Sequence, residues 1–137
     1  MEMRIGFPGG MRVDVAFAEH TVCTDQPRSA GGDGSAPSPF DLFVASIGAC
    51  VGYYVLAFCS RREIPVDGID LALHTEAPPD GKGVARILVD IGLPESFPER
   101  YVDACVRAAE QCTVKRHLES PPEIVLRPLR PGPGSGC

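Results

Sequence analysis

The chain has 137 residues, of which 44% are apolar and 23% are charged, and its formal net charge is -5. This length and apolar content suit one domain with its own core and argue against a globally disordered chain. The acidic balance argues against a non-specific nucleic-acid binder, which needs a basic surface to displace counterions.

Six cysteines, at positions 23, 50, 59, 105, 112 and 137, are many for this length. A disulfide-stapled secreted domain is one interpretation, but the first residues contain no apolar segment typical of a signal peptide. Several cysteines lie in apolar helical patterns, where reduced thiols pack as small hydrophobic groups. We therefore expect a cytoplasmic protein with mostly reduced cysteines. No CxxC pair is present, and the three histidines have no ligand spacing, so no metal site is predicted.

The first part of the chain has the pattern of β-strands followed by a loop. Apolar and polar residues alternate over 11–17, and 21–24 is a second, shorter strand candidate. Residues 27–38 are too rich in glycine and proline for regular structure. We expect this segment to be a connecting or functional loop.

A long helix is predicted from Ser38 to about Arg62. Ser38 suits the N-cap, Pro39 suits the first helical position, and Asp41 completes a capping box. Residues 42–59 are 18 positions without a charge, the lower limit for crossing a membrane. Glycine, serine and tyrosine dilute the hydrophobicity of this segment, and charged residues flank it. We therefore expect no membrane span but a central buried helix, which a small domain achieves most easily by dimerising.

The second half of the chain predicts a hairpin and another helix. Residues 69–74 and 85–91 alternate as strands do, and residues 78–81 between them are typical of a turn. A second helix with a capping-box pattern is expected from Ser96 to about Gln111.

A last strand is expected at 123–127, followed by a flexible tail rich in proline and glycine at 128–137. The strands pair through short turns and outnumber the helices. This order predicts an α+β fold with an antiparallel sheet, in one domain over residues 1–127.

Two cysteines are candidates for chemistry. From the local pattern alone, Cys50 is either a reactive thiol or a core residue of a tightly packed helix. Gly48 leaves space near its sulfur, and a glycine within a helix costs about 1 kcal/mol relative to alanine, so close packing or a ligand should compensate. Cys112 lies at the end of the second helix, where a side chain can move. Cys59 and Cys105 are interpreted as core residues.

Two motifs resemble the signatures of the OsmC/Ohr family. Residues 36–42 (Ala-Pro-Ser-Pro-Phe-Asp-Leu), which lead into 45–50, are similar to the first signature. Residues 110–118, with Cys112 followed by a small residue, a valine and a later leucine, are similar to the second. The two cysteines are 62 positions apart (112 minus 50), and the resemblance covers about residues 10–127. The Ala-Pro-Ser-Pro stretch is similar to the motif that precedes this helix in a third, less characterised subgroup of the family.

The resemblance implies an intertwined homodimer with an OsmC-like fold and sites at the subunit interface. It implies that Cys50 attacks an organic hydroperoxide as a thiolate, which would protect against oxidative stress. The resulting sulfenic acid would condense with Cys112 to form a disulfide. A dithiol or a lipoylated protein would then reset the enzyme, and no cofactor is implied.

Further residues are candidates for the same site. A reactive thiolate usually needs a nearby cation, and the best candidate is Arg28 in the Gly-rich loop, with Arg12 as a weaker alternative. Arg28 could equally be an ordinary exposed loop residue. Four aromatic side chains could form an apolar wall that favours alkyl hydroperoxides: Phe40, Phe43, Tyr53 and Tyr54.

The chain departs from the family pattern at one place. OsmC and Ohr proteins carry a glutamate ten residues before the reactive cysteine, which holds the arginine. Here that position is Phe40, and the acid is Asp41. One residue rotates a helix position by about 100°, so Asp41 either acts in an altered geometry or serves only as a helix cap. The departure favours an alternative, a non-catalytic small-molecule-binding or redox-sensing dimer, whereas the cysteine pair favours the enzyme.

Overall fold

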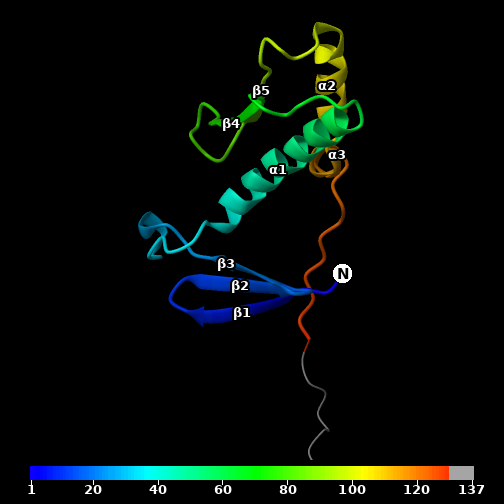
Figure 1. The fold of residues 1–137 in the computed structure, drawn as a ribbon. Helices are drawn as coiled ribbons and strands as arrows, with labels where there is room; N and C mark the ends of the chain where they lie inside the picture. The colour runs from blue at the N-terminus through cyan, green and yellow to red at the C-terminus, as the bar shows by residue number, and fades with distance from the viewer. Residues whose placement is uncertain (130–137) are drawn as a thin grey trace, which may run out of the picture.

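The structure, a computed structural model, describes residues 1–129. It has an α+β fold with antiparallel sheets and one long central helix, as the sequence predicts (Figure 1). The strands are β1 (Arg4–Gly9), β2 (Arg12–Phe17), β3 (His20–Thr24), β4 (Asp70–Glu76) and β5 (Arg86–Gly92). The helices are α1 (Pro39–Ser60), α2 (Val102–Ala109) and α3 (Thr113–Glu119), with short 3-10 helices η1 (Arg28–Ala30) and η2 (Glu99–Tyr101).

The first three strands form an antiparallel sheet with β2 in the centre. In Figure 1 this sheet lies away from α2, α3 and the β4–β5 hairpin. Its apolar residues Ile5 and Phe7 are 54% and 82% exposed. A single chain therefore leaves this sheet largely uncovered.

A capping box between Ser38 and Asp41 defines the start of α1. The Ser38 hydroxyl accepts a hydrogen bond from the Asp41 N–H (3.2 Å), and the Asp41 carboxylate accepts one from the Ser38 N–H (2.9 Å). This reciprocal capping box fixes the start of the helix at Pro39, as predicted. The helix ends at Ser60, close to the predicted end and ahead of Pro65.

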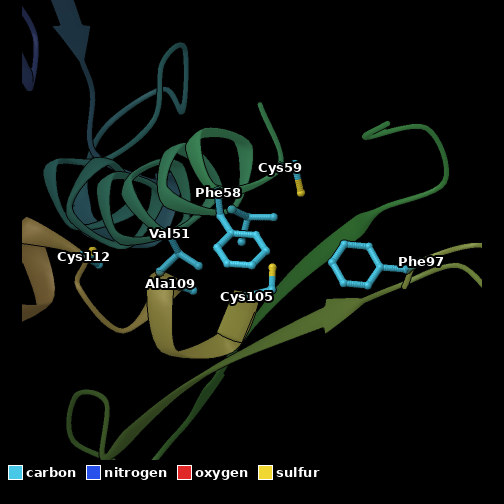
Figure 2. Packing of buried hydrophobic residues seen from close by; sticks show 8 residues of the cluster. Val51, Phe58, Cys59, Phe97, Cys105, Ala109 and Cys112 are labelled. Atoms are coloured by element: carbon cyan, nitrogen blue, oxygen red, sulfur yellow. The ribbon is translucent and has the colours of Figure 1, made fainter. Parts of the chain in front are cut away.

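One side of α1 is buried and the other is uncovered. The buried residues are Ile47, Val51, Val55, Phe58 and Cys59. All but Ile47 belong to the main core, which residues of α2 and Phe97 extend (Figure 2). On the uncovered side, Tyr53 and Leu56 are 62% and 52% exposed. By length and composition α1 is apolar enough to cross a membrane, and 28% of its most apolar stretch is buried within the fold.

The β4–β5 hairpin forms as predicted and packs beside α1. Its strands pair along their whole length. Residues 78–81 make a turn in which Gly81 has a φ of +69°, a conformation that suits glycine. A Cβ added to Gly48 of α1 would lie 3.5 Å from the Leu73 side chain of β4. This is the packing expected to compensate for a glycine two residues before Cys50.

The second helix is shorter than predicted. The sequence predicts a helix from Ser96 to about Gln111, whereas α2 spans only Val102–Ala109 and follows η2. The start at Ser96 is wrong because Pro98 disfavours helical geometry in the residue before it. That residue, Phe97, is buried in the core instead.

The predicted strand at 123–127 is also wrong. Residues 121–129 have no regular structure. Prolines at positions 121, 122 and 128 flank the segment and lack the N–H that a strand ladder uses. Among residues 1–129, the two sheets contain no strand that pairs with it. Most of the predicted flexible tail, 128–137, lies outside the described residues.

Candidate active site

The candidate site lies where the middle of α1 meets the start of α3. Cys112 is the N-cap of α3, and its sulfur accepts a hydrogen bond from the Lys115 N–H (3.4 Å). One turn after Cys50, the hydroxyls of Tyr54 and Thr113 are hydrogen-bonded at 2.9 Å. These contacts hold the first turn of α3 against α1.

Three groups of this junction act on the Cys50 thiol. Burial of the half-buried side chain raises the pKa of the Cys50 thiol. The N–H of Val114, the side chain of Cys112 and the N–H of Thr113 together outweigh burial, so the pKa is below its ordinary value. Donors aimed at a sulfur favour its thiolate form.

Cys112 has the opposite character. It is fully buried, and this burial raises the pKa of its thiol. Its hydrogen bond with Cys50 and the charge of a Cys50 thiolate raise the pKa further, against smaller opposing contributions from the N–H groups of Lys115 and Val114. The junction therefore pairs a thiol whose pKa is lowered with a thiol whose pKa is raised.

Arg28 lies far from Cys50 in its own chain. It is exposed in η1, and its Nε–H donates to the Asp33 carbonyl at 3.5 Å. Cys50 lies 11 residues after Pro39 (50 minus 39), about 17 Å along the helix axis. Within residues 1–129, the groups that set the Cys50 pKa do not include Arg28. Arg12, the weaker candidate, is exposed at the start of β2.

The loop that carries Arg28 is organised by Asp25, which the sequence reading did not single out. The buried Asp25 carboxylate accepts hydrogen bonds from the N–H groups of Gln26 (2.8 Å), Asp33 (3.2 Å) and Ser35 (2.9 Å) and from the Ser35 hydroxyl (2.8 Å). The bonds from Ser35 are the main cause of its lowered pKa. The sequence feature that could have indicated this role is the position of Asp25, an acidic residue directly before a Gly-rich loop.

Asp41 is occupied by the helix cap. Its carboxylate accepts hydrogen bonds from the Ser38 hydroxyl (2.8 Å) and the Ser38 N–H (2.9 Å), and these bonds lower the Asp41 pKa. Phe40, at the position of the family glutamate, is 50% exposed, and its ring centroid lies 5.6 Å from that of Phe43. The structure therefore places Asp41 and Phe40 at the helix start, away from the cysteine pair.

The predicted aromatic wall is divided along α1. Tyr53 and Tyr54 follow Cys50 within one turn, and their rings meet edge to face at 5.5 Å. Phe43 lies seven residues before Cys50 (50 minus 43), so it is two turns away on the same side of the helix. The tyrosines thus lie within one turn of Cys50, and Phe43 and Phe40 extend an apolar strip toward the helix start.

Comparison with known families decides the identity of this fold. The family model of OsmC-like proteins matches residues 32–127, which include α1 and both cysteine motifs. The chain belongs to the OsmC family. None of the curated proteins matches the chain.

Solved structures show the same fold in other OsmC-type proteins. A protein from Psychrobacter arcticus 273-4, described as an osmotic stress induced and detoxification response protein, has a TM-score of 0.71 at 20% identity, over 83% of this chain and 85% of that one. An organic hydroperoxide resistance protein OsmC from Legionella pneumophila has a TM-score of 0.52 at 22% identity, over 86% and 89%. The organic hydroperoxide resistance protein OhrB of Bacillus subtilis has a TM-score of 0.53 at 18% identity, over 88% and 93%. At these identities the likeness establishes the fold alone.

An apolar cavity of this OsmC-family chain lies between α1, β5 and the α2–α3 segment. It has a volume of about 340 Å³ and is lined by Ile47, Val51, Ile87, Val89, Ile91, Val106, Ala109, Glu110, Lys115 and Leu118. Two lining residues, Ala109 and Lys115, lie three residues to either side of Cys112 along the chain, and neither Cys50 nor Cys112 is itself among the lining residues. The alternation of apolar residues along β5 predicts a buried face but not a hollow beside it. Within residues 1–129, no group of three or more histidine, cysteine or acidic side chains is placed to hold a metal ion.

Proposed function

We propose that this protein is a thiol peroxidase that reduces organic hydroperoxides with Cys50 and Cys112. The contrast between the two thiols carries the proposal. Hydrogen bonds from the first turn of α3 lower the pKa of Cys50, while burial raises the pKa of Cys112. A two-cysteine peroxidase needs one cysteine that attacks the hydroperoxide as a thiolate and a second cysteine close by that condenses with the resulting sulfenic acid.

The reaction follows from these two roles. The Cys50 thiolate attacks the terminal oxygen of the hydroperoxide and the O–O bond breaks, so that Cys50 becomes a sulfenic acid. The alkoxide that leaves takes one proton from solvent and becomes the alcohol. The Cys112 thiol then attacks the Cys50 sulfur, and water leaves as the disulfide forms. A small dithiol or a lipoylated protein would reduce the disulfide and return both thiols. The similarity to the Legionella and Bacillus proteins, both named organic hydroperoxide resistance proteins, supports this substrate class.

The proposal includes an intertwined homodimer. The sheet β1–β3 and one side of α1 are uncovered in a single chain, with Phe7 82% and Tyr53 62% exposed. A Cβ added to Gly52, on that side of α1, would meet no atom within 4 Å, which leaves room for the close approach of a second helix. Such a dimer would cover both surfaces without a membrane. It would suit a cytoplasmic protein whose cysteines are reset by cellular thiols.

The dimer would also supply what one chain lacks at Cys50. Arg28 of the partner subunit is the proposed cation beside the thiolate, because Arg28 of the same chain lies beyond the start of α1. Tyr53, Tyr54, Phe43 and Phe40 are proposed to contact the apolar part of the substrate. Asp41 is proposed to act through the cap, by fixing where α1 begins.

Turnover of cumene hydroperoxide with dithiothreitol tests the function. We expect wild type to consume hydroperoxide and Cys50→Ser to fall to the uncatalysed background. Cys23→Ser is the matched control, since Cys23 is an exposed thiol on β3 and should keep full activity. Wild type without consumption above background would overturn the proposal.

A redox-sensing dimer is the second candidate. The observation that favours it is Phe40 at the glutamate position, together with an Asp41 carboxylate that is held by Ser38. A sensor whose Cys50–Cys112 disulfide is reduced only slowly by the dithiol would consume about one hydroperoxide per chain, with little further consumption when dithiol is supplied. The same assay therefore separates the two candidates by the number of hydroperoxide molecules consumed per chain.

A further inference from the structure

A second pair of thiols lies in the core. Cys59 is near the end of α1 and Cys105 is in α2, and both are 0% exposed. Each thiol is among the groups that shift the pKa of the other, so the two side chains are close neighbours. Figure 2 shows the two sulfurs pointing toward one another, in a view where Phe58 and Phe97 lie on either side. The sequence reading treated each as a separate core residue.

This pair is separate from the candidate active site. Cys59 follows Cys50 by nine residues (59 minus 50) along α1, which corresponds to about 13 Å. Cys105 in α2 precedes Cys112, the N-cap of α3, by seven residues (112 minus 105). A disulfide between Cys50 and Cys112 is therefore out of reach of the second pair, because exchange needs direct contact of sulfurs.

We propose that Cys59 and Cys105 are a second redox site, which an organic hydroperoxide oxidises to a disulfide that locks α1 to α2. One of the two sulfurs attacks the peroxide, the O–O bond breaks, and the alcohol leaves as that sulfur becomes a sulfenic acid. The other thiol displaces water from it and forms the S–S bond. Two electrons pass from the sulfurs to the hydroperoxide, which yields one alcohol and one water.

The surroundings of the second pair make its oxidation slow. Burial raises the pKa of both thiols, and the Arg62 guanidinium lowers it only in part. Arg62 lies over the Phe58 ring, 3.9 Å from its centroid, so a cation is at hand when α1 and α2 separate locally. The reaction therefore requires local opening, and the disulfide that results lies under the rings of Phe58 and Phe97. A bulky reductant reaches it only by the same opening.

Trypsin separates the two disulfides in one digest. It cleaves after Arg28, Arg61, Arg100, Arg107 and Lys115. Peptide 29–61 then carries both Cys50 and Cys59, peptide 101–107 carries Cys105, and peptide 108–115 carries Cys112. A link from 29–61 to 108–115 reports the first pair, and a link from 29–61 to 101–107 reports the second.

The experiment follows both linked peptides by mass spectrometry while wild type is exposed to cumene hydroperoxide, with free thiols blocked at each time. We expect the link to 108–115 first and the link to 101–107 at least about tenfold more slowly, since Cys59 and Cys105 are fully buried and react only after local opening. Mixing 15N-labelled and unlabelled protein shows whether each link joins residues of one chain. A link to 101–107 that never forms, or that forms only between chains, overturns the proposal.

The Cys50→Ser, Cys112→Ser double variant makes the second site independent of the first. We expect it to form the link to 101–107 at the wild-type rate, and its melting temperature to rise by up to about 10 °C on oxidation because the disulfide closes a long loop. Adding Cys59→Ala should abolish both changes. If the double variant does not fold, the wild-type time course still decides. Loss of the link in a folded double variant would show that the second pair has no chemistry of its own and would overturn the proposal.

Discussion

The two thiol pairs of this chain join the same helices but have opposite surroundings. Cys50 and Cys112 meet at the start of α3, where backbone N–H groups point at a half-buried sulfur. Cys59 and Cys105 meet inside the core, fully buried, with burial as the main influence on both. Proximity of two sulfurs is thus common to both pairs. The hydrogen-bond donors and the access to solvent are what differ, and these control how fast a thiol reacts.

The largest effect is expected from removing a side chain that covers Cys59 and Cys105, because this should reduce the difference in burial between the two thiol pairs. Phe97 is 6% exposed and packs in the cluster that contains Cys59 and Cys105. Phe97→Ala should lower the free energy of unfolding by about 3–5 kcal/mol and speed formation of the Cys59–Cys105 disulfide. Urea unfolding and the tryptic assay measure the two effects.

Leu126→Ala is the matched control for Phe97→Ala. Leu126 is 91% exposed, so we expect its replacement to change the free energy of unfolding by less than about 0.5 kcal/mol. A Phe97→Ala variant as stable as this control would contradict the core assignment.

The next substitution removes one of the backbone N–H groups that lower the Cys50 pKa. Thr113 is the first residue of α3, where proline is tolerated, and Cys112 before it has an extended ψ of 118° that suits a following proline. Thr113→Pro removes a hydrogen bond that lowers the Cys50 pKa, so that pKa should rise. Less thiolate is then present at neutral pH, and alkylation of Cys50 by iodoacetamide should slow.

Thr113→Val separates this effect from the loss of the hydroxyl. Both substitutions remove the bond to Tyr54, but only proline removes the N–H. We expect valine to leave the pH midpoint of Cys50 alkylation near that of wild type and proline to move it upward. Equal midpoints for the two variants would show that the hydroxyl, and not the N–H, sets the reactivity.

Gly52→Ala tests whether a partner covers the side of α1 between the two pairs. In an isolated chain the added methyl meets nothing within 4 Å, so alanine should stabilise the helix by about 1 kcal/mol. In a dimer with closely packed helices, the same methyl should instead weaken association. Urea unfolding measures whether the substitution raises the stability, and light scattering over a dilution series measures whether it weakens the dimer. A monomer at every micromolar concentration for wild type would contradict the dimer.

The smallest expected effects come from the helix cap, which lies away from both pairs. Ser38→Ala should cost about 1 kcal/mol of stability and Ser38→Gly a few tenths, because glycine retains a favourable N-cap conformation. Neither should change the alkylation rate of Cys50 at neutral pH beyond the effect of unfolding. A selective change at Cys50 would show that the start of α1 contributes directly to the site.

Local patterns predicted the elements whose signals are local. The capping box at Ser38 and the turn at 78–81 formed as expected, since each depends on a few neighbouring residues. The helix at Ser96 failed because Pro98 overrode a capping-box pattern. The strand at 123–127 failed because a short apolar run indicates strand propensity but does not supply a partner strand, and prolines flank this run.

The candidate site was predicted only as far as the family motifs reached. They named Cys50 and Cys112 together, and the structure brings these two into contact. No local signal named the N–H groups of Thr113 and Val114, because a backbone donor has no sequence signature. The pairing of Cys59 with Cys105 was missed for a related reason, since it depends on how α1 crosses α2.

The four hydrogen bonds to Asp25 bear on the range of acidity over which the Arg28 loop keeps its shape. Because the Asp25 pKa is lowered, folding gains stability from this carboxylate above its ordinary value near 4 and loses it as the pH falls through the lowered pKa. The loop that holds the arginine therefore keeps this contribution at neutral pH and loses it only in acid.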